Sequence, residues 1–211
     1  MAINENSDLE NRHCFVGAKT GGGKSQLMRN ELIPASGIRA VFWDVDKDHK
    51  CKRYYKKGPF MRALAAADRD GKPYRVGWSG DDSPETFMWF CECVWRLLDG
   101  SHETYVILEE MADQGMGQKL PPWLRKLIVR GRKYGAILFI TTQRCQEIPK
   151  ALITQPGYRY IGLHEDHDAR YMYRATGIKS EELEALPPLT FFKKGPQGVE
   201  RISTKWKKFT A

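Results

Sequence analysis

Short apolar runs alternate with segments of helical periodicity along most of this chain. The runs that predict buried strands are 13–17, 40–45, 104–108 and 136–141. The segments with the spacing of helices are 24–33, 83–100 and 121–134. Strands that alternate with helices are typical of βαβ units, in which a mostly parallel central sheet is flanked by helices. The pattern therefore predicts the α/β class.

The remaining elements are predicted by shorter signals. We expect strands at 74–78 and 158–163, a helix at about 166–175 and a closing hairpin near 189–203. Ser83, Pro84 and Glu85 form a good helix start, because a capping hydroxyl precedes a proline and an early carboxylate.

Length and composition limit the classes of protein that this chain can be. Its 211 residues predict one domain, with a core at about 12–175 and a basic, strand-rich extension at about 187–211. Mean hydropathy is −0.55 and no apolar run approaches the ~18 residues of a membrane span, so we expect no integral membrane segment. The polar N-terminus lacks the apolar stretch of a signal peptide. The five cysteines are odd in number and form no CxxC pair, which favours reduced thiols inside a cell.

The formal net charge of +8 is unevenly distributed. Residues 47–57 and 193–211 each hold six Lys or Arg against one acid, so each carries +5 and the rest of the chain carries −2. Both segments interleave aromatic residues with the cations, as a surface that binds a phosphate backbone would. A solubilising face explains the same composition.

A glycine-rich segment after the first predicted strand fits the P-loop pattern. It runs through Ala18, Lys19, Thr20, Gly21, Gly22, Gly23, Lys24, Ser25 and Gln26, with Ala18 in place of the usual first glycine. Glycines let backbone N–H groups turn inward around phosphate oxygens, and the following helix adds a favourable dipole. Lys24 would then reach the β- and γ-phosphates, and the Ser25 hydroxyl would bind Mg²⁺. The segment predicts an ATP site; the alternative is a glycine-rich turn without function.

Polar residues that follow two other strands complete the predicted site. Glu109 would hold hydrated Mg²⁺ and Glu110 would activate water, although the usual pair is Asp-Glu. Gln143 follows the strand at 136–141 and could orient the attacking water. One of the arginines in the helix before that strand could reach the nucleotide of a neighbouring subunit, although solvent exposure is the more usual role for any single arginine there.

A histidine- and acid-rich stretch at 164–168 has the composition of a metal site. It falls at a strand-to-helix junction, where Asp166 can cap the helix and the other side chains can face solvent. We expect the capping role.

Together these motifs resemble the HerA/FtsK superfamily of P-loop ATPases. The residues that carry the resemblance are VGAKTGGGKS at 16–25, the acids at 109–110, RxxG at 132–135 and TQR at 142–144. The chain is short, and it looks most like the genome-packaging ATPases of membrane-containing, double jelly-roll viruses and phages. The resemblance implies a RecA/FtsK-like P-loop domain in a ring, typically a hexamer, that threads double-stranded DNA through its centre while it hydrolyses ATP.

The same resemblance implies roles, partners and a location. Lys24 and Ser25 match the phosphate and Mg²⁺ motif, Glu109 and Glu110 the metal-holding and water-activating acids, and Gln143 the γ-phosphate sensor. Arg132 matches the arginine offered in trans, with Arg130 as second choice. Partners would be double-stranded DNA, other copies of the chain, and capsid or membrane vertex proteins. The location would be the host cytoplasm or the packaging vertex of the virion.

Other functions fit parts of the sequence. Within the superfamily, a filamentous-phage assembly ATPase or a plasmid-transfer ATPase would carry the same motifs. From another class, a P-loop small-molecule kinase also has a basic lid, for which 129–135 would serve. A nucleotide-switched DNA-binding protein without useful turnover is the third alternative.

Overall fold

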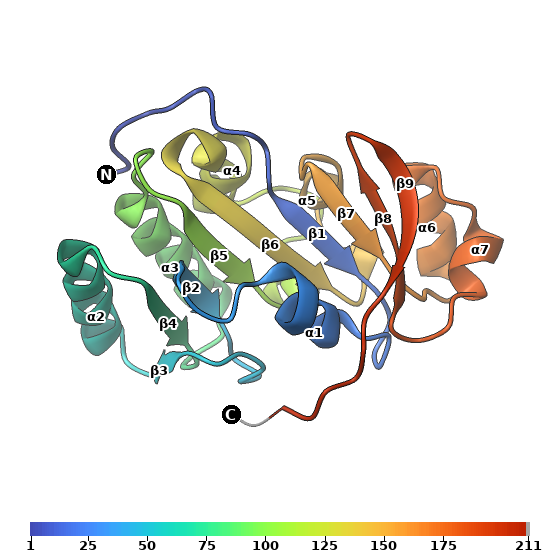
Figure 1. Cartoon of the computed structure of the whole chain (residues 1–211), viewed down its shortest axis with the longest axis horizontal. Helices are drawn as coiled ribbons and strands as arrows, with labels where there is room; N and C mark the ends of the chain where they lie inside the picture. Colours follow the sequence, from blue (N-terminus) through green and yellow to red (C-terminus); the bar gives the residue numbers. More distant parts are fainter. Residues whose placement is uncertain (210–211) are drawn as a thin grey trace.

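One sheet runs through the molecule, with helices on both of its faces (Figure 1). The structure, a computed structural model, describes residues 1–209. The strands are β1 (Cys14–Gly17), β2 (Arg39–Trp43), β3 (Lys52–Tyr54), β4 (Tyr74–Trp78), β5 (Thr104–Leu108), β6 (Ala136–Thr142), β7 (Tyr158–Ile161), β8 (Thr190–Gly195) and β9 (Gly198–Ser203). The α-helices are α1 (Lys24–Leu27), α2 (Lys57–Asp70), α3 (Pro84–Leu97), α4 (Pro122–Arg130), α5 (Lys150–Thr154), α6 (Asp166–Thr176) and α7 (Ser180–Glu184).

Shorter helical turns extend or connect these elements. A π-helical turn (Met28–Leu32) continues α1, and a 3₁₀ turn (Gly131–Tyr134) continues α4. Two further 3₁₀ turns (Met111–Gln114 and Cys145–Glu147) follow β5 and β6. No helix within residues 1–209 is long and apolar enough to cross a bilayer.

The strand order is β3-β4-β2-β5-β6-β1-β7-β8-β9. The seven strands from β3 to β7 pair in parallel, and β8 and β9 add an antiparallel hairpin at one edge. The predicted α/β class with a mostly parallel sheet is confirmed. Because parallel strands end at the same edge of a sheet, the segments that follow β1, β2, β5 and β6 meet there.

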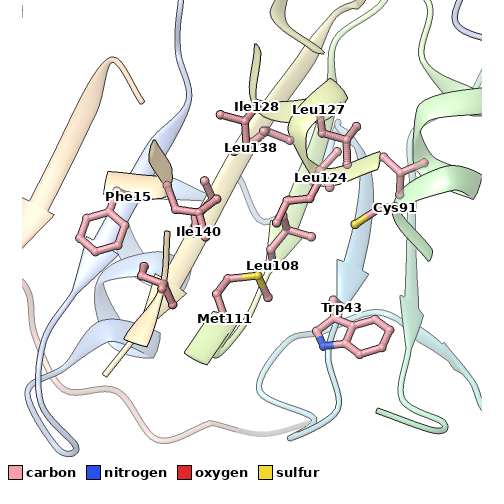
Figure 2. Close-up of a cluster of buried hydrophobic side chains, with 14 of the residues drawn as sticks. Phe15, Trp43, Cys91, Leu108, Met111, Leu124, Leu127, Ile128, Leu138 and Ile140 are labelled. Atoms are coloured by element: carbon pink, nitrogen blue, oxygen red, sulfur yellow. The ribbon is translucent and has the colours of Figure 1, made fainter. Parts of the chain in front are cut away.

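Alternating side chains of the central strands belong to two apolar layers, one on each face of the sheet. On one face, Leu108, Leu138 and Ile140 pack against α3 and α4, and on the other, Ile107 and Phe139 pack with Leu27 and Met28 of the α1 region. Figure 2 shows part of the first layer, with Leu124, Leu127 and Ile128 of α4 facing Leu138 and Cys91 of α3 beside them. Both faces are covered, so the strands read as continuous apolar runs.

An aromatic cluster fixes α3 against β2. The Trp43 ring lies 5.1 Å from Phe87 and 5.4 Å from Phe90, both in edge-on geometry. Ser83 caps the helix as predicted, since its hydroxyl accepts the Thr86 N–H. The predicted helix at 83–100 is confirmed, with its end at Leu97.

Several elements were not predicted. No element is predicted over the residues of α2, because this helix buries just Phe60 and Leu64 and so shows a short apolar stripe. Strand β3 is a polar strand at the edge of the sheet, without apolar alternation. The predicted extension at 187–211 joins the main sheet through β8 and β9, and its last two residues, Thr210 and Ala211, lie outside the described residues.

Gly135, the glycine of the RxxG motif, allows a close approach of two backbones. It has φ +76°, and an added Cβ would lie 2.0 Å from the carbonyl oxygen of His102. Gly71 has a similar φ of +64° but no atom within 4 Å of that position. We expect Gly135→Ala to lower the free energy of unfolding by more than about 3 kcal/mol, and Gly71→Ala by only about 1 kcal/mol. Urea unfolding of the two variants measures the difference, and equal losses would show that the His102 contact is unimportant.

Candidate active site

The P-loop folds back around its own lysine. Gly21 and Gly23 have φ values of +74° and +101°, which glycine adopts without strain. The Lys24 ammonium is buried and donates to the Ala18 carbonyl at 3.1 Å. A Cβ on Gly23 would lie 2.7 Å from the Leu189 side chain, so the loop also needs glycine there for packing.

Glu110 is the acid that approaches this lysine. Its Oε1 lies 3.4 Å from the Lys24 Nζ, and its Oε2 accepts the Gln143 backbone N–H at 3.2 Å. Burial raises the pKa of the Glu110 carboxyl above its ordinary value, although Lys24 acts in the opposite direction. Glu110 also has a left-handed backbone, with φ +46°, which is uncommon for a residue other than glycine. Its position and raised pKa suit a general base.

Glu109 is held more firmly, by two protein donors. Its Oε1 lies 2.6 Å from His49 Nε2, and its Oε2 accepts the Thr141 hydroxyl at 2.6 Å. Burial alone would raise the pKa of Glu109, but these two hydrogen bonds, together with the electrostatic attraction of His49 and Lys24, outweigh it and the pKa is lowered. The carboxylate is therefore ionised and fixed in orientation.

Three side chains that the sequence did not assign belong to the same region. Asp48 Oδ2 accepts the Ser25 hydroxyl at 2.8 Å, and His49 pairs with Glu109. Asp46 lines the same cleft. Burial is the main cause that raises its pKa, and the nearby carboxylates raise it further. Acids at alternate positions after a buried strand were a usable signal, because β2 ends at the same sheet edge as β1.

Asp44 explains how this loop is fixed. Its side chain is fully buried, and its Oδ1 accepts the backbone N–H groups of Asp48 at 2.7 Å and His49 at 3.2 Å. Its Oδ2 accepts from Arg53 Nε at 3.2 Å. Burial raises the pKa of Asp44. Asp44 thus acts as a structural anchor that positions the two residues beside the P-loop.

The predicted nucleotide residues gather around one cleft of about 350 Å³. The lining residues are Thr20, Gly21, Gly23, Lys24, Ser25, Gln26, Arg29, Asp46, Asp48, Glu109, Glu110, Gln143, Leu189 and Trp206. A larger hollow of about 630 Å³ lies at the β8–β9 hairpin and contains none of the predicted residues. The chemistry therefore points to the smaller cleft.

Side-chain contacts fix both ends of the P-loop. The Thr20 hydroxyl donates to the Gln143 side-chain oxygen, so the predicted sensor residue contacts the loop directly. Lys19 makes an exposed ion pair with Glu165. The Gln26 side-chain amide donates to the Lys207 carbonyl and accepts the Lys207 N–H, each at 2.9 Å.

The cleft offers oxygen ligands that suit Mg²⁺. The Ser25 hydroxyl and the Asp48 and Glu109 carboxylates are hard donors, and Mg²⁺ in nucleotide sites needs only one or two such groups besides phosphates and water. Within residues 1–209 no three His, Cys, Asp or Glu side chains cluster as a complete metal cage. The donor set thus fits a metal that is shared with a nucleotide.

Neither predicted arginine lines the cleft of its own chain. Arg132 donates to the backbone carbonyls of Ser7, at 2.9 Å, and Leu9, which ties the N-terminal segment to the turn after α4. Arg130 is exposed at the end of α4.

The stretch at 164–168 does not bring its histidines together. His164 is buried, with Nε2 3.2 Å from the Cys145 thiol and Nδ1 2.8 Å from the Gly162 carbonyl, whereas His167 is exposed. The predicted cap at Asp166 is wrong: α6 begins at that residue, and its side chain pairs with Arg170 instead.

The sequence is similar to that of a phage protein. Protein P9 of Pseudoalteromonas phage PM2 is 31% identical over 179 residues, which cover 84% of this chain and 81% of P9. No protein-family model matches the sequence.

Solved structures show the same fold. The genome packaging NTPase B204 of Sulfolobus turreted icosahedral virus 2, in complex with ATP-gammaS, aligns with a TM-score of 0.74 and 16% identity over 93% of this chain and 98% of its own. VirB4 of Thermoanaerobacter pseudethanolicus aligns with a TM-score of 0.64 and 11% identity, over 93% and 90% of the two chains. The predicted resemblance is confirmed.

Thr141→Val tests the fixation of Glu109 and keeps the shape of the side chain. In the nucleotide-free protein we expect the pKa of Glu109 to rise, because its charged form loses a hydrogen bond. A carboxyl whose pKa is lower in the folded than in the unfolded protein stabilises the fold at pH values above its unfolded-state pKa of 4.5. This contribution disappears as the pH falls through the pKa of the folded protein. The variant should therefore lose about 1.5–3 kcal/mol near neutral pH and less in acid.

Urea unfolding across pH, with ¹³C NMR of the glutamate carboxyls, measures both effects. Thr176→Val is the matched control, since its buried hydroxyl donates to the Met172 carbonyl at 2.6 Å and touches no carboxylate. A pH-independent loss in Thr141→Val, as expected for the control, would contradict the role given to Thr141.

Proposed function

Because this chain belongs to the family of protein P9 of phage PM2 and shares the fold of the packaging NTPase B204, we propose that it is an ATPase that drives double-stranded DNA into a viral capsid. The observation that carries the proposal is the cleft in which Lys24, Glu110 and Gln143 converge. The same motifs on the same sheet edge support ATP as the nucleotide.

The residues divide the work of hydrolysis. Backbone N–H groups of the P-loop and the Lys24 ammonium would bind the β- and γ-phosphates. Glu110 would accept a proton from the attacking water, and Gln143 would orient that water. Ser25, Glu109 and Asp48 would hold Mg²⁺, which when bound neutralises charge on the phosphates. Displacement of the Glu110 carboxylate from Lys24 by a phosphate would leave it next to the water.

The apolar part of the cleft supports a place for the base. Leu189 and Trp206 line it together with Gly21 and Gly23, and Leu189 packs directly against Gly23. Trp206 is 68% exposed, so its ring is available for stacking. We place the adenine there and the phosphates at Lys24.

We further propose a ring in which an arginine acts in trans, since neither candidate reaches the cleft of its own chain. Arg130 is now the first choice, because the Arg132 guanidinium is engaged by carbonyl oxygens of Ser7 and Leu9. A ring, typically a hexamer, would surround the DNA and dock on capsid or membrane vertex proteins. It would work in the host cytoplasm or at the packaging vertex of the virion.

ATP hydrolysis with and without duplex DNA tests the function. We expect DNA to stimulate turnover of the natural chain. Lys24→Ala should abolish turnover, since the phosphates lose their cation, and Glu110→Gln should bind ATP but hydrolyse it at least about 100-fold more slowly. Phosphate release and nucleotide binding are the two measurements. No stimulation by DNA, together with phosphoryl transfer to a small acceptor, would overturn the proposal in favour of a kinase.

Mixed rings test the arginine. Arg130→Ala should be inactive alone but regain hydrolysis when mixed with Lys24→Ala, because some interfaces then pair an intact P-loop with an intact arginine. Arg132→Ala should instead lower the thermal midpoint and show no complementation. Complementation by Arg132→Ala alone would return Arg132 to the trans role, and complementation by neither variant would contradict an arginine in trans at these positions.

A further inference from the structure

The two basic segments of the sequence meet at one pocket. Five cations line this pocket of about 200 Å³: Arg29, Lys50, Arg75, Lys207 and Lys208. Lys50 comes from the first basic segment, and Lys207 and Lys208 come from the second. Figure 1 shows how this happens: after β9 the chain turns back past α1 toward the side of the molecule that carries β3.

Specific contacts hold the C-terminal segment in this position. The Gln26 side chain makes two hydrogen bonds of 2.9 Å with the backbone of Lys207, and Asn30 Nδ2 donates to the Lys205 carbonyl at 2.7 Å. The Arg29 guanidinium lies 4.7 Å from the centre of the Phe209 ring. The segment is therefore fixed on the helix that follows the P-loop, and its lysines are brought to the pocket by backbone bonds that do not involve their ammonium groups.

The pocket has an excess of positive charge. No carboxylate is among its lining residues, and within residues 1–209 none of Lys50, Lys207 and Lys208 makes an ion pair. Arg75 is half-buried, and its guanidinium donates to the carbonyls of Lys50 at 2.6 Å and Pro34 at 2.9 Å. Cations that line one small pocket repel one another, and an anion bound between them relieves that repulsion.

A buried histidine provides a second, independent observation. His49 lines the pocket and is fully buried, and its Nδ1 has no hydrogen-bond partner within the described residues. Buried polar atoms without a partner are rare, because each one costs free energy. Its Nε2 is already engaged by Glu109 of the nucleotide cleft at 2.6 Å. The ring thus lies between the cleft and this pocket, and a polar atom of a ligand in the pocket would complete its bonding.

We propose that this pocket is a second anion site that binds a phosphate group. A phosphate is small enough for 200 Å³ and presents several oxygens to several cations at once. Two sources share that chemistry: free inorganic phosphate, which ATP hydrolysis in the adjoining cleft would also release, and a backbone phosphate of DNA. Arg29 lines both that cleft and the pocket. Binding of inorganic phosphate is independent of the proposed function, whereas binding of a DNA phosphate rests on it.

A pair of double variants of the full chain tests the site. Lys50→Gln with Lys208→Gln removes two exposed pocket cations, and Lys72→Gln with Lys179→Gln removes two exposed lysines elsewhere, so both variants lose the same charge. The probes are inorganic phosphate, followed by calorimetry, and a fluorescent duplex DNA, followed by anisotropy over a salt series. Hydrolysis of ATP without DNA is measured alongside.

We expect the pocket variant to bind at least one of the two probes about tenfold more weakly than the natural chain, and the control to bind within about twofold. Loss for phosphate alone identifies the free ion as the ligand. Loss for DNA, with a salt slope reduced by about 1 beyond the control, identifies a backbone phosphate. If the two variants bind both probes equally, the proposed anion site is overturned, even where ATP hydrolysis is normal. If the natural chain does not hydrolyse ATP, that result contradicts the proposed function instead.

Discussion

The buried contact between the Lys24 ammonium and the Glu110 carboxylate is the interaction on which the rest of the site depends. An ammonium and a carboxylate that are largely withheld from water are tolerable only when other groups support each of them. Lys24 has the Ala18 carbonyl for this purpose, and Glu110 has the backbone N–H of Gln143. Three strands therefore have to end at the same level of the sheet, and the parallel order β5-β6-β1 satisfies that requirement.

The two adjacent acids have different surroundings although they are neighbours in sequence. Glu109 receives hydrogen bonds from His49 and Thr141 that lower its pKa, whereas burial raises the pKa of Glu110. Two carboxyls whose pKa values are driven apart are suited to two roles, one as a permanently charged group and one as a proton acceptor. His49 can provide its part of this difference only because Asp44 fixes the backbone of its loop.

Several cations of the two basic segments make contacts within the fold, and others gather at the pocket beside α1. Arg53 pairs with Asp44, Lys193 pairs with Glu200, and Lys194 bonds the carbonyl of Thr176. These cations of the two basic segments stabilise the fold, so they cannot all serve a nucleic acid. Lys50, Lys207 and Lys208 at the pocket beside α1 are different, because none of them pairs with a carboxylate within the described residues, whereas Arg29 of the same pocket lies 4.0 Å from Asp48.

The sequence by itself determined the elements whose cause is local or periodic. Buried parallel strands appear as apolar runs, the P-loop as a glycine pattern and α3 as a capped amphipathic helix, so these were predicted, together with the acids and the glutamine that follow β5 and β6. Helix α2 was not, because two buried side chains leave too weak a stripe. Tertiary structure alone decided that Asp48 reaches Ser25 of the P-loop, that His49 reaches Glu109, and that Lys50 and Lys208 line one pocket. Such pairings depend on strand order and on the return of the chain after β9, and no local pattern of residues encodes either of them.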